Sequence, residues 1–246
     1  MNRNKIISII LTTYNRPEFL WECLESCIYQ DYPYKEILVI DDGSEYMNRM
    51  NNENIIQALK TKHENEKIIC LYKQNGGCSS AYNYGISRAS GGFICIMHDD
   101  DKYYNRSVLS NLIEPFFKYP YLEMVYGQPV DLVKGKEQRA KADFPVPPVL
   151  ILKDDYIYLT VMMWRKSAFE KIGLFDEELR SNEDFDIEIR SIMELSTFFI
   201  PTPVVFYRRH PGNKSTINAG KMDYYKRIFL RKLKERYKDL ILMEKA

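Results

Sequence analysis

The sequence has little that would mark a membrane protein or a nucleic-acid-binding protein. The apolar segment nearest its start, Ile6 to Leu11, is interrupted by Ser8 and is far too short for a membrane span or a signal peptide. The 35 basic and 34 acidic residues leave a net charge of only +1, so no overall field favours nucleic acid. Any basic contact surface must therefore be local, and we expect a cytoplasmic protein.

Metal-thiolate patterns and glycine-rich nucleotide motifs are missing too. The five cysteines are odd in number and lie mostly in apolar segments, which favours reduced core thiols over a disulfide framework. Their spacing matches no zinc site. No G-x-G-x-x-G follows the first predicted strand, and no Walker A lysine loop occurs. These absences argue against dinucleotide oxidoreductases and P-loop enzymes.

The first hundred residues contain an alternation of strand and helix patterns. Strands that alternate with helices indicate βαβ units and a mostly parallel sheet. Polar residues follow the first, second and fourth predicted strands, so these strand ends should form one rim where a nucleotide can bind. The strands are predicted over 6–11, 37–40, 68–71 and 93–97, and the helices from Pro17, over roughly 53–62 and over 79–89.

The most unusual stretch is His98-Asp99-Asp100-Asp101, which follows the predicted strand over 93–97. Three adjacent carboxylates repel one another and resist burial, so they need a cation, hydrogen-bond donors or water. Mg²⁺ and Mn²⁺ prefer oxygen ligands and are commonly held by one or two carboxylates together with substrate phosphates. An isolated acidic run is usually a solvated loop, but the place of this one at a strand end favours a metal and phosphate site.

The second half is predicted to be less regular than the first. A proline-rich, charged stretch up to Pro148 is interpreted as a mobile loop, which either covers a substrate or is a plain surface excursion. Glu183 and Asp184 fall in the first turn of a later helix, where acids suit the helix dipole. Helices are predicted over 107–118, up to Gly173 and from about Asn182, and a strand is predicted over 123–130.

The order of several motifs carries a resemblance to a known family. Over about residues 5–215 the chain resembles family 2 glycosyltransferases, which are inverting enzymes with a GT-A fold. The resemblance implies an α/β architecture in which a Rossmann-like, mostly parallel sheet is flanked by helices and followed by a mixed C-terminal acceptor half. The motifs are Ser8-Ile9-Ile10-Leu11-Thr12-Thr13-Tyr14-Asn15-Arg16, Val39-Ile40-Asp41-Asp42-Gly43-Ser44, the acidic strand end, and Gly173-Leu174-Phe175-Asp176 before Glu183-Asp184.

The resemblance also implies an activity and roles for the matched positions. The activity is transfer of a sugar from a nucleoside-diphosphate sugar, with UDP-sugars first among the candidates, to the hydroxyl of a glycan or lipid-linked acceptor. The implied cofactor is Mn²⁺ or Mg²⁺. The roles are Thr12, Tyr14 and Arg16 near the nucleotide, Asp41 on the base, Asp99 on the ribose, Asp100 on the metal and Asp184 as the catalytic base.

Elementary chemistry agrees with the two central assignments. A leaving diphosphate develops negative charge, so a metal on Asp100 would lower the barrier electrostatically. A carboxylate such as Asp184 can accept the proton of an acceptor hydroxyl in the transition state. On spacing alone, Asp184 is equally well interpreted as a carboxylate that serves the helix dipole.

The sequence departs from the family pattern at two places. The family often has an acidic residue where this chain has His98, and an Arg beside the Asn of its post-glycine helix, where this chain has Tyr82-Asn83-Tyr84-Gly85. The departure at His98 leaves two adjacent candidates for the metal-binding carboxylate, Asp100 and Asp101. His98 is interpreted either as a ligand or as a hydrogen-bonded structural residue.

A late basic segment, Tyr207-Arg208-Arg209-His210-Pro211, resembles a basic loop of the family. We predict that Arg209 contacts the nucleotide diphosphate, because guanidinium groups bind phosphate oxygens in pairs. His210 is a candidate for the diphosphate or for the metal. A solvated basic turn is the alternative.

We expect one GT-A catalytic domain over 1–219, with a nucleotide-binding half over 1–104 and an acceptor half over 105–219. The tail over 220–246 is predicted to be a basic amphipathic helix, because Lys221 to Ala246 contain nine Lys or Arg and four Asp or Glu. Such a helix can cover the protein's own body, which we favour, or make peripheral contact with the inner face of a membrane.

The leading hypothesis is a metal-dependent inverting glycosyltransferase of bacterial surface polysaccharide or glycan synthesis. One alternative is a sugar nucleotidyltransferase, but the glycine-rich N-terminal loop of those enzymes is missing. The other is a non-catalytic module that binds a sugar nucleotide or a glycan, and the presence of Asp100 and Asp184 counts against it.

Overall fold

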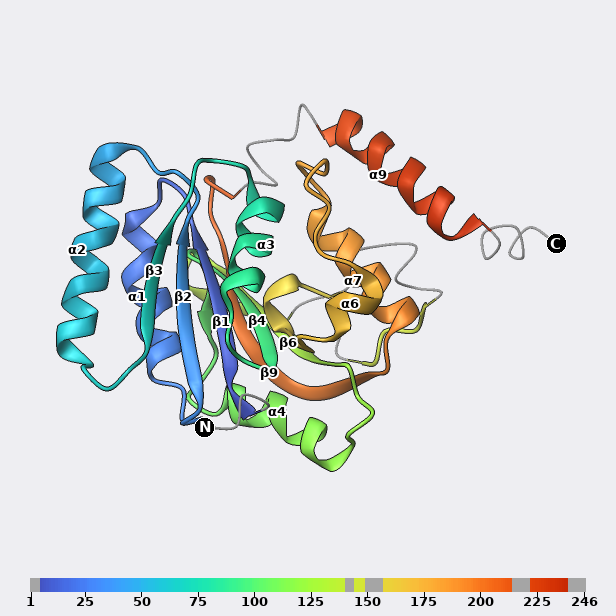
Figure 1. Ribbon diagram of the computed structural model, residues 1–246, viewed down its shortest axis with the longest axis horizontal. Helices are drawn as coiled ribbons and strands as arrows, with labels where there is room; N and C mark the ends of the chain where they lie inside the picture. The colour runs from blue at the N-terminus through green and yellow to red at the C-terminus, as the bar shows by residue number, and fades with distance from the viewer. Residues whose placement is uncertain (1–4, 140–143, 149–156, 214–221, 239–246) are drawn as a thin grey trace.

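The computed structural model describes residues 5–139, 144–148, 157–213 and 222–238 (Figure 1). One sheet runs through both halves of the chain in the order β3-β2-β1-β4-β8-β6-β9-β5, and β7 pairs with β6. Helices flank this sheet, so the α/β architecture predicted from the sequence is confirmed. The proposed boundary at residue 104 stays a prediction.

The N-terminal half is a parallel sheet made of βαβ units. Strands β1, β2, β3 and β4 pair in parallel, as expected from their uninterrupted apolar runs. Right-handed crossovers in opposite directions place α1 and α2 on one face and α3 on the other. The bounds are β1 (Ile7–Thr13), α1 (Pro17–Ile28), β2 (Lys35–Asp41), α2 (Tyr46–Lys62), β3 (Ile68–Tyr72), α3 (Cys78–Arg88) and β4 (Phe93–His98).

Helix α2 begins at Tyr46, well before the predicted start at residue 53. Its first turn exposes Tyr46 and Met47, and only Asn52, Ile56 and Leu59 are buried along its length. The early turns therefore carry no apolar stripe, and the helical spacing that sequence analysis relies on appears late.

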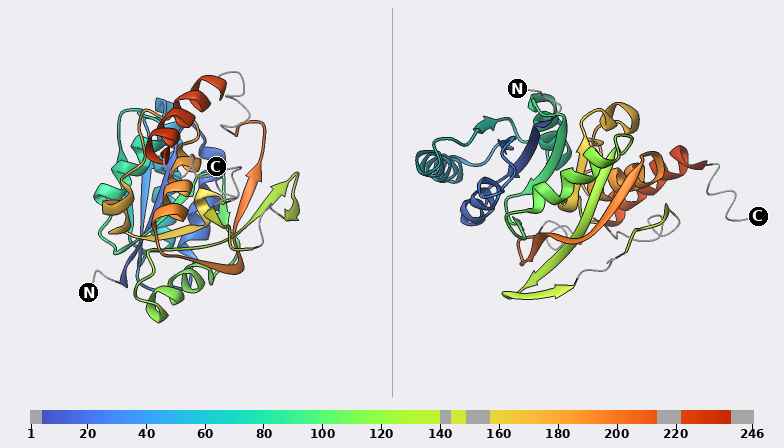
Figure 2. Two further views of the ribbon diagram at one scale, coloured as in Figure 1. Left: turned by 90° about the vertical axis from the view of Figure 1, so that its right-hand side faces the viewer. Right: turned by 90° about the horizontal axis from the view of Figure 1, so that it is seen from below.

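The C-terminal half extends the same sheet with mixed pairing (Figure 2). Strand β8 is antiparallel to both β4 and β6, whereas β6 and β9 are parallel. The bounds are β5 (Lys102–Tyr103), α4 (Val108–Lys118), β6 (Met124–Val133), β7 (Lys136–Arg139), η2 (Leu159–Val161), β8 (Met162–Arg165), α6 (Ala168–Ile172), α7 (Glu183–Glu194) and β9 (Thr197–Arg209).

Two expectations for this half are wrong. The stretch after residue 130 was expected to be a mobile loop, but β6 continues to Val133 and turns through Lys134 and Gly135 into β7. Both turn residues have positive φ, 50° and 76°, which suits a two-residue hairpin. The late basic segment was expected to be a loop, but its first three residues end strand β9. Residues 140–143 and 149–156 of the predicted loop region lie outside the described residues.

Helix α9 (Met222–Arg236) packs on the body, as favoured from the sequence. Phe229 is buried, and its ring centroid lies 5.3 Å from that of Phe185 in α7. Lys232 forms an ion pair with Asp176, and Arg236 bonds Glu194 at 2.7 Å. None of the helices in the described ranges combines the length and apolar character needed to cross a bilayer.

Candidate active site

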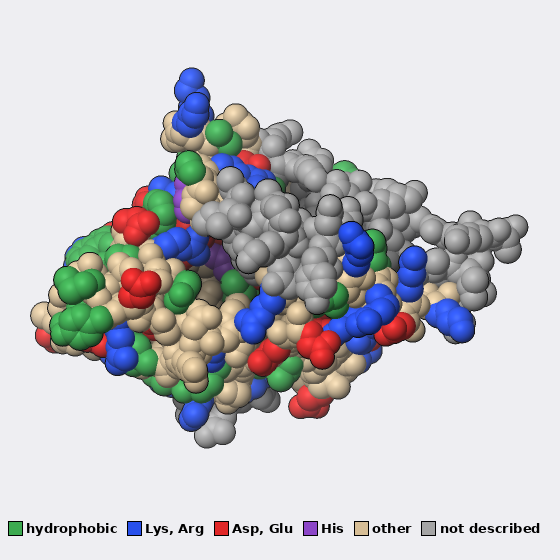
Figure 3. All heavy atoms as spheres, turned by 90° about the horizontal axis from the view of Figure 1, so that it is seen from above, with side chains coloured by type: hydrophobic (Ala, Val, Ile, Leu, Met, Phe, Trp, Pro, Cys, Tyr) green, Lys and Arg blue, Asp and Glu red, His purple; other side chains and the backbone are tan. Residues whose placement is uncertain are grey.

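The ends of β1, β2 and β4 form one rim of the sheet, as predicted. Thr13 pairs in register with Asp41, and Thr12 with His98, so the polar residues after these strands lie side by side. Figure 3 looks onto this end of the molecule, and a hollow with a histidine side chain at its edge is visible there.

The first part of this hollow encloses about 290 Å³ at the ends of β1 and β2. Thr12, Tyr14 and Arg16, predicted to lie near the nucleotide, all line it. The turn over 75–77 and the start of α3 form the opposite wall. Backbone amides and a guanidinium on these walls suit an anionic, hydrogen-bonding ligand.

Asp41, predicted to contact the base, does not line this hollow. It is 1 % exposed, and its carboxylate accepts hydrogen bonds from the backbone N–H of Ser44 at 2.7 Å and from Asn52 Nδ2 at 3.1 Å. Asp41 therefore closes the turn after β2 and anchors that turn to α2. Its nucleotide role stays a prediction.

Asp42, which sequence analysis did not single out, is the carboxylate that lines the hollow. It accepts bonds from the backbone N–H groups of Gly76 at 3.0 Å and Gly77 at 2.8 Å, and from Lys73 Nζ at 2.6 Å. The adjacent Gly43 has a φ of 79°, and a Cβ there would lie 2.6 Å from a backbone nitrogen. The sequence signal was the Asp41-Asp42 pair before Gly43, but a pair of adjacent Asp residues does not indicate which of them faces the hollow.

The three carboxylates after β4 are buried, with 0 %, 5 % and 2 % exposure at Asp99, Asp100 and Asp101. Arg16 pairs with Asp99 at 2.7 Å and also with Asp100. His210 Nε2 lies 3.0 Å from Asp100 Oδ2. The structure therefore brings together five residues of the predicted nucleotide and metal sites, namely Arg16, Asp99, Asp100, Asp101 and His210.

Burial and mutual repulsion set the charges of this cluster. Loss of solvent raises the pKa of Asp99 to about 7, against the attraction of Arg16. Burial and then the charge of Asp100 raise the pKa of Asp101 well above its usual value. Burial also acts against ionisation of Asp100, but Arg16 and two imidazoles outweigh it and lower its pKa. The single positive charge of Arg16 does not balance three buried carboxylates, so the cluster favours the binding of an additional cation.

The residues present fit a divalent ion. His98, Asp100 and Asp101 each offer a ligand atom, and these atoms lie within 4.8 Å of one another. Asp101 Oδ1 accepts the backbone N–H of Arg208, but its buried Oδ2 accepts no hydrogen bond from the described residues. An orphaned buried oxygen beside two further ligand atoms is what a cation site requires.

Asp184 lies in a second part of the hollow, of about 220 Å³, which also contains Asp100 and His98. Thr12, Arg16 and Cys78 line both parts, so the two parts adjoin. The rim thus connects the predicted nucleotide residues to the predicted base through the acid cluster.

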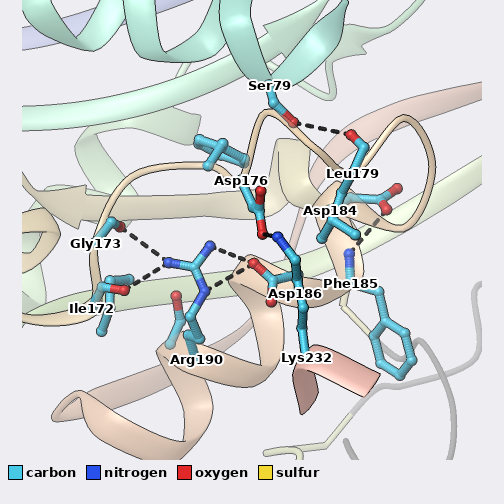
Figure 4. A network of polar contacts seen from close by, with 12 residues as sticks. Ser79, Ile172, Gly173, Asp176, Leu179, Asp184, Phe185, Asp186, Arg190 and Lys232 are labelled. Atoms are coloured by element: carbon cyan, nitrogen blue, oxygen red, sulfur yellow. Dashed lines mark hydrogen bonds and ion pairs between the residues drawn. The ribbon is translucent and has the colours of Figure 1, made fainter. Parts of the chain in front are cut away.

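A network behind Asp184 fixes the start of α7 (Figure 4). Arg190 bonds Asp186 at 2.5 Å and donates to the carbonyl oxygens of Ile172 at 2.7 Å and Gly173 at 3.1 Å. These bonds join α7 to the Gly173 turn, which explains why the Gly-Leu-Phe-Asp motif precedes the acidic helix start in the sequence.

Arg209 is not brought to the acid cluster. Its guanidinium bonds Asp131 at 3.2 Å and the hydroxyl of Tyr158 at 2.6 Å. The neighbouring Arg208 turns to the cluster instead, where its Nε donates to the carbonyl oxygen of Asp100 at 3.0 Å. Successive side chains of a strand point to opposite faces, and β9 reaches this far, so only one of the two arginines can face the rim.

Comparisons with known proteins agree with this geometry. The family model described as Glycosyl transferase family 2 matches residues 8–173. An uncharacterised glycosyltransferase of Rickettsia typhi is 26% identical over 98% of this chain and 76% of its own length. The glycosyltransferase GlyG of Streptococcus pneumoniae is 33% identical over 54% of this chain and 39% of its own.

Solved glycosyltransferases share the fold. TarS of Staphylococcus aureus in complex with UDP-GlcNAc superposes with a TM-score of 0.67, at 19% identity over 84% of this chain. The mannosyltransferase PcManGT of Pyrobaculum calidifontis, in complex with GDP-Man and Mn²⁺, gives 0.64 at 15% identity over 88%. This chain spans 59% of each of those two chains. The fold is thus GT-A-like, and the chain belongs to glycosyl transferase family 2.

Proposed function

We propose that this glycosyltransferase is a metal-dependent, inverting enzyme that takes its sugar from a UDP-sugar. The observation that carries the proposal is that the two parts of the rim hollow adjoin, one lined by Tyr14 and the other by Asp100 and Asp184. A glycosyltransferase needs the nucleotide site, the diphosphate site and the acceptor hydroxyl to follow one another in this order. The UDP-GlcNAc and GDP-Man complexes of structural neighbours support a nucleotide-sugar donor.

Thr12, Tyr14 and Arg16 line the hollow and hold the nucleotide. Asp99 is buried behind Arg16, and we retain it as the ribose contact that the resemblance implies. We retain Asp41 as a base contact that acts from the turn that it closes. In this assignment, residues 1–104 bind the nucleotide and residues 105–219 bind the acceptor.

The chemistry assigned to the site is a single displacement. Asp100 and Asp101, with His210 as a further candidate ligand, would hold a divalent ion, Mn²⁺ or Mg²⁺, which would supply electrostatic stabilisation for the charge that develops on the leaving diphosphate. Asp184 accepts the proton of the acceptor hydroxyl as that oxygen attacks the anomeric carbon from the face opposite the diphosphate. Attack from the opposite face inverts the configuration of that carbon.

A first experiment measures sugar transfer and donor hydrolysis with UDP-sugars and GDP-mannose in Mn²⁺, Mg²⁺ and EDTA. We expect turnover with a UDP-sugar, its loss in EDTA, and its collapse in Asp184→Asn with donor affinity kept within a few-fold. Asp31→Asn changes an exposed carboxylate in the same way and serves as the control. Full activity in EDTA would contradict the metal dependence.

The same assay separates the alternatives. A binding module would hold UDP-sugar without any turnover, and a sugar nucleotidyltransferase would release nucleoside triphosphate when given pyrophosphate. The glycosyltransferase proposal expects neither result. Product stereochemistry, read by NMR from the anomeric coupling constant, tests inversion.

For the acceptor and its setting, we propose a glycan or lipid-linked molecule of bacterial surface polysaccharide synthesis, made at the inner face of the membrane. One face of α9 packs on the body, and the other carries Arg227, Arg231, Lys234 and Lys238 at helical spacing. Such a row is suited to anionic lipid headgroups. The five free cysteines support a cytoplasmic location.

Vesicle flotation tests this contact. Full-length protein should bind anionic vesicles at low salt and release them as salt rises, because surface charge attraction is screened. Reversal of Arg231 and Lys234 to Glu should remove binding without lowering the melting temperature. Absence of vesicle binding at low salt would overturn the membrane contact and leave the enzyme proposal intact.

A further inference from the structure

Tyr82 and His98 form a pair at the edge of the acid cluster. The hydroxyl of Tyr82 lies 2.8 Å from His98 Nε2, and the two rings are stacked at 23° with centroids 5.9 Å apart. Tyr82 itself is 2 % exposed and packs against Phe175, with centroids 4.7 Å apart. The orientation of the imidazole is therefore fixed by a rigid partner.

This orientation turns the other imidazole nitrogen toward the carboxylates. His98 Nδ1 lies 3.8 Å from Asp101 Oδ2, the buried oxygen that accepts no hydrogen bond from the described residues. That separation is too long for a hydrogen bond. Two ligands of one ion, each about 2.1 Å from it, lie about 3.0 to 4.2 Å apart, and the observed separation falls in this range.

Tyr82 engages Nε2, so Nδ1 is the imidazole nitrogen that faces the carboxylates. A tyrosine with its ordinary pKa of about 10 is a neutral hydroxyl at physiological pH. Its oxygen can accept Nε2–H, and the lone pair of the imidazole then resides on Nδ1, which faces Asp101. Metal-bound histidines are generally oriented by such a hydrogen bond at the other nitrogen.

We propose that His98 binds the divalent ion through Nδ1 together with Asp100 and Asp101, and that Tyr82 is the positioning residue for this imidazole. The proposal rests on the metal dependence proposed above. It names His98 as the nitrogen ligand, whereas the sequence pattern also left His210 as a histidine candidate for the metal. Imidazole suits Mn²⁺ and later transition metals better than Mg²⁺, which prefers oxygen, so the site should prefer Mn²⁺.

Electron paramagnetic resonance of bound Mn²⁺ tests this ligand directly. We expect the protein with Mn²⁺ and UDP to show nitrogen hyperfine coupling of a directly bound imidazole, which His98→Ala removes. Of the three histidines of the chain, His63 lies outside the site, so His63→Ala is the matched control that should keep the coupling. His210→Ala removes the competing candidate ligand beside Asp100 and should also keep the coupling. Melting curves without metal establish that each variant is folded.

Metal preference supplies a second readout. Tyr82→Phe should weaken Mn²⁺ binding by about tenfold while Mg²⁺ binding changes little, because only the nitrogen ligand loses its orientation. His98→Asp restores an all-oxygen site and should move the preference toward Mg²⁺ by about tenfold or more. A purely structural role for the pair would change the affinities for both metals alike.

The outcomes separate this inference from the proposed function. Mn²⁺ binding without nitrogen coupling, or coupling lost only in His210→Ala, overturns the role of His98 and leaves the metal-dependent enzyme standing. If neither Mn²⁺ nor Mg²⁺ binds in the presence of UDP, both proposals are wrong.

Discussion

Two buried carboxylate sites lie at opposite ends of the same parallel strands and differ in their supply of donors. Glu36, near the start of β2, is 1 % exposed and accepts bonds from Ser8 Oγ at 2.7 Å and from both the backbone N–H and the hydroxyl of Ser90 at 2.6 and 2.8 Å. Lys67 also pairs with it. At the other end, Asp99 is fully buried and shares Arg16 with Asp100.

The pKa values record this difference. Burial alone would raise the pKa of Glu36, but the bonds from Lys67, Ser8 and Ser90 outweigh it and lower the value to about 2. Burial raises the pKa of Asp99 to about 7, because its donors are too few. A buried carboxylate whose hydrogen-bond donors all come from the chain is structural, whereas a cluster with too few donors, as at Asp99, Asp100 and Asp101, favours binding of a cation from outside.

The largest expected contrast is in turnover. Asp100→Asn should lower kcat/KM by about a thousandfold, or about 4 kcal/mol of transition-state stabilisation, because it removes a charged metal ligand. Glu36→Gln makes the same chemical change at the other end and should stay within about twofold. Steady-state kinetics with saturating Mn²⁺ measure both, and an equal loss in the two variants would erase the distinction.

Stability should show the reverse order. Glu36→Gln should lower the free energy of unfolding by about 3 kcal/mol, because a shift from 4.5 to about 2 in the pKa corresponds to that amount. Asp100→Asn should lower it by less than Glu36→Gln does, because relief of the repulsion on Asp99 and Asp101 offsets part of the loss of the pairs with Arg16 and His210. Urea unfolding in EDTA gives both values. A stable Glu36→Gln would show that the polar network is dispensable.

Added Mn²⁺ should stabilise the folded protein only by binding to the carboxylate cluster at the carboxyl end of β4. At a free Mn²⁺ concentration of 100 times Kd, wild type and Glu36→Gln should each gain about 2.7 kcal/mol. Asp100→Asn should gain almost nothing at the same concentration. Melting curves with and without Mn²⁺ provide the measurement, and equal stabilisation of all three proteins would place the ion elsewhere.

The smallest effect is the dependence of stability on pH without metal. Asp99 has a raised pKa in the folded state, so its contribution is lost as pH rises from about 4 to 7. Glu36 has a lowered pKa, so its contribution is lost as pH falls from 4.5 to about 2. Asp99→Asn should flatten the first slope, which for one proton cannot exceed about 1.36 kcal/mol per pH unit, and Glu36→Gln the second.

Much of the rim could be predicted from the sequence because parallel strands are buried on both faces and appear as short apolar runs. The ends of β1, β2 and β4 were expected at one edge from the order of elements alone, and their register confirms it. The start of α7 near Asn182 was also predicted, because acids in a first helical turn are a local signal.

What could not be predicted depends on register and on distant partners. Asp42 rather than Asp41 faces the hollow, and Arg208 rather than Arg209 faces the cluster, because a shift of one residue reverses the direction of a strand side chain. The four donors around Glu36 come from segments 28 to 54 residues away. No local sequence pattern predicts a network whose members are this far apart in the chain.

The ion pair of Arg16 with Asp99 and Asp100 makes this side chain an exchangeable counterion. A guanidinium and a divalent ion compete for the same Asp100 oxygens, so we expect loading of the ion to release Arg16 into the hollow where the diphosphate lies. Coupling between two ligands is reciprocal. If the bound ion raises the affinity for the nucleotide by releasing Arg16, the bound nucleotide must raise the affinity for the ion by the same factor. On this expectation, the ion and the nucleotide would help each other to bind through one arginine side chain.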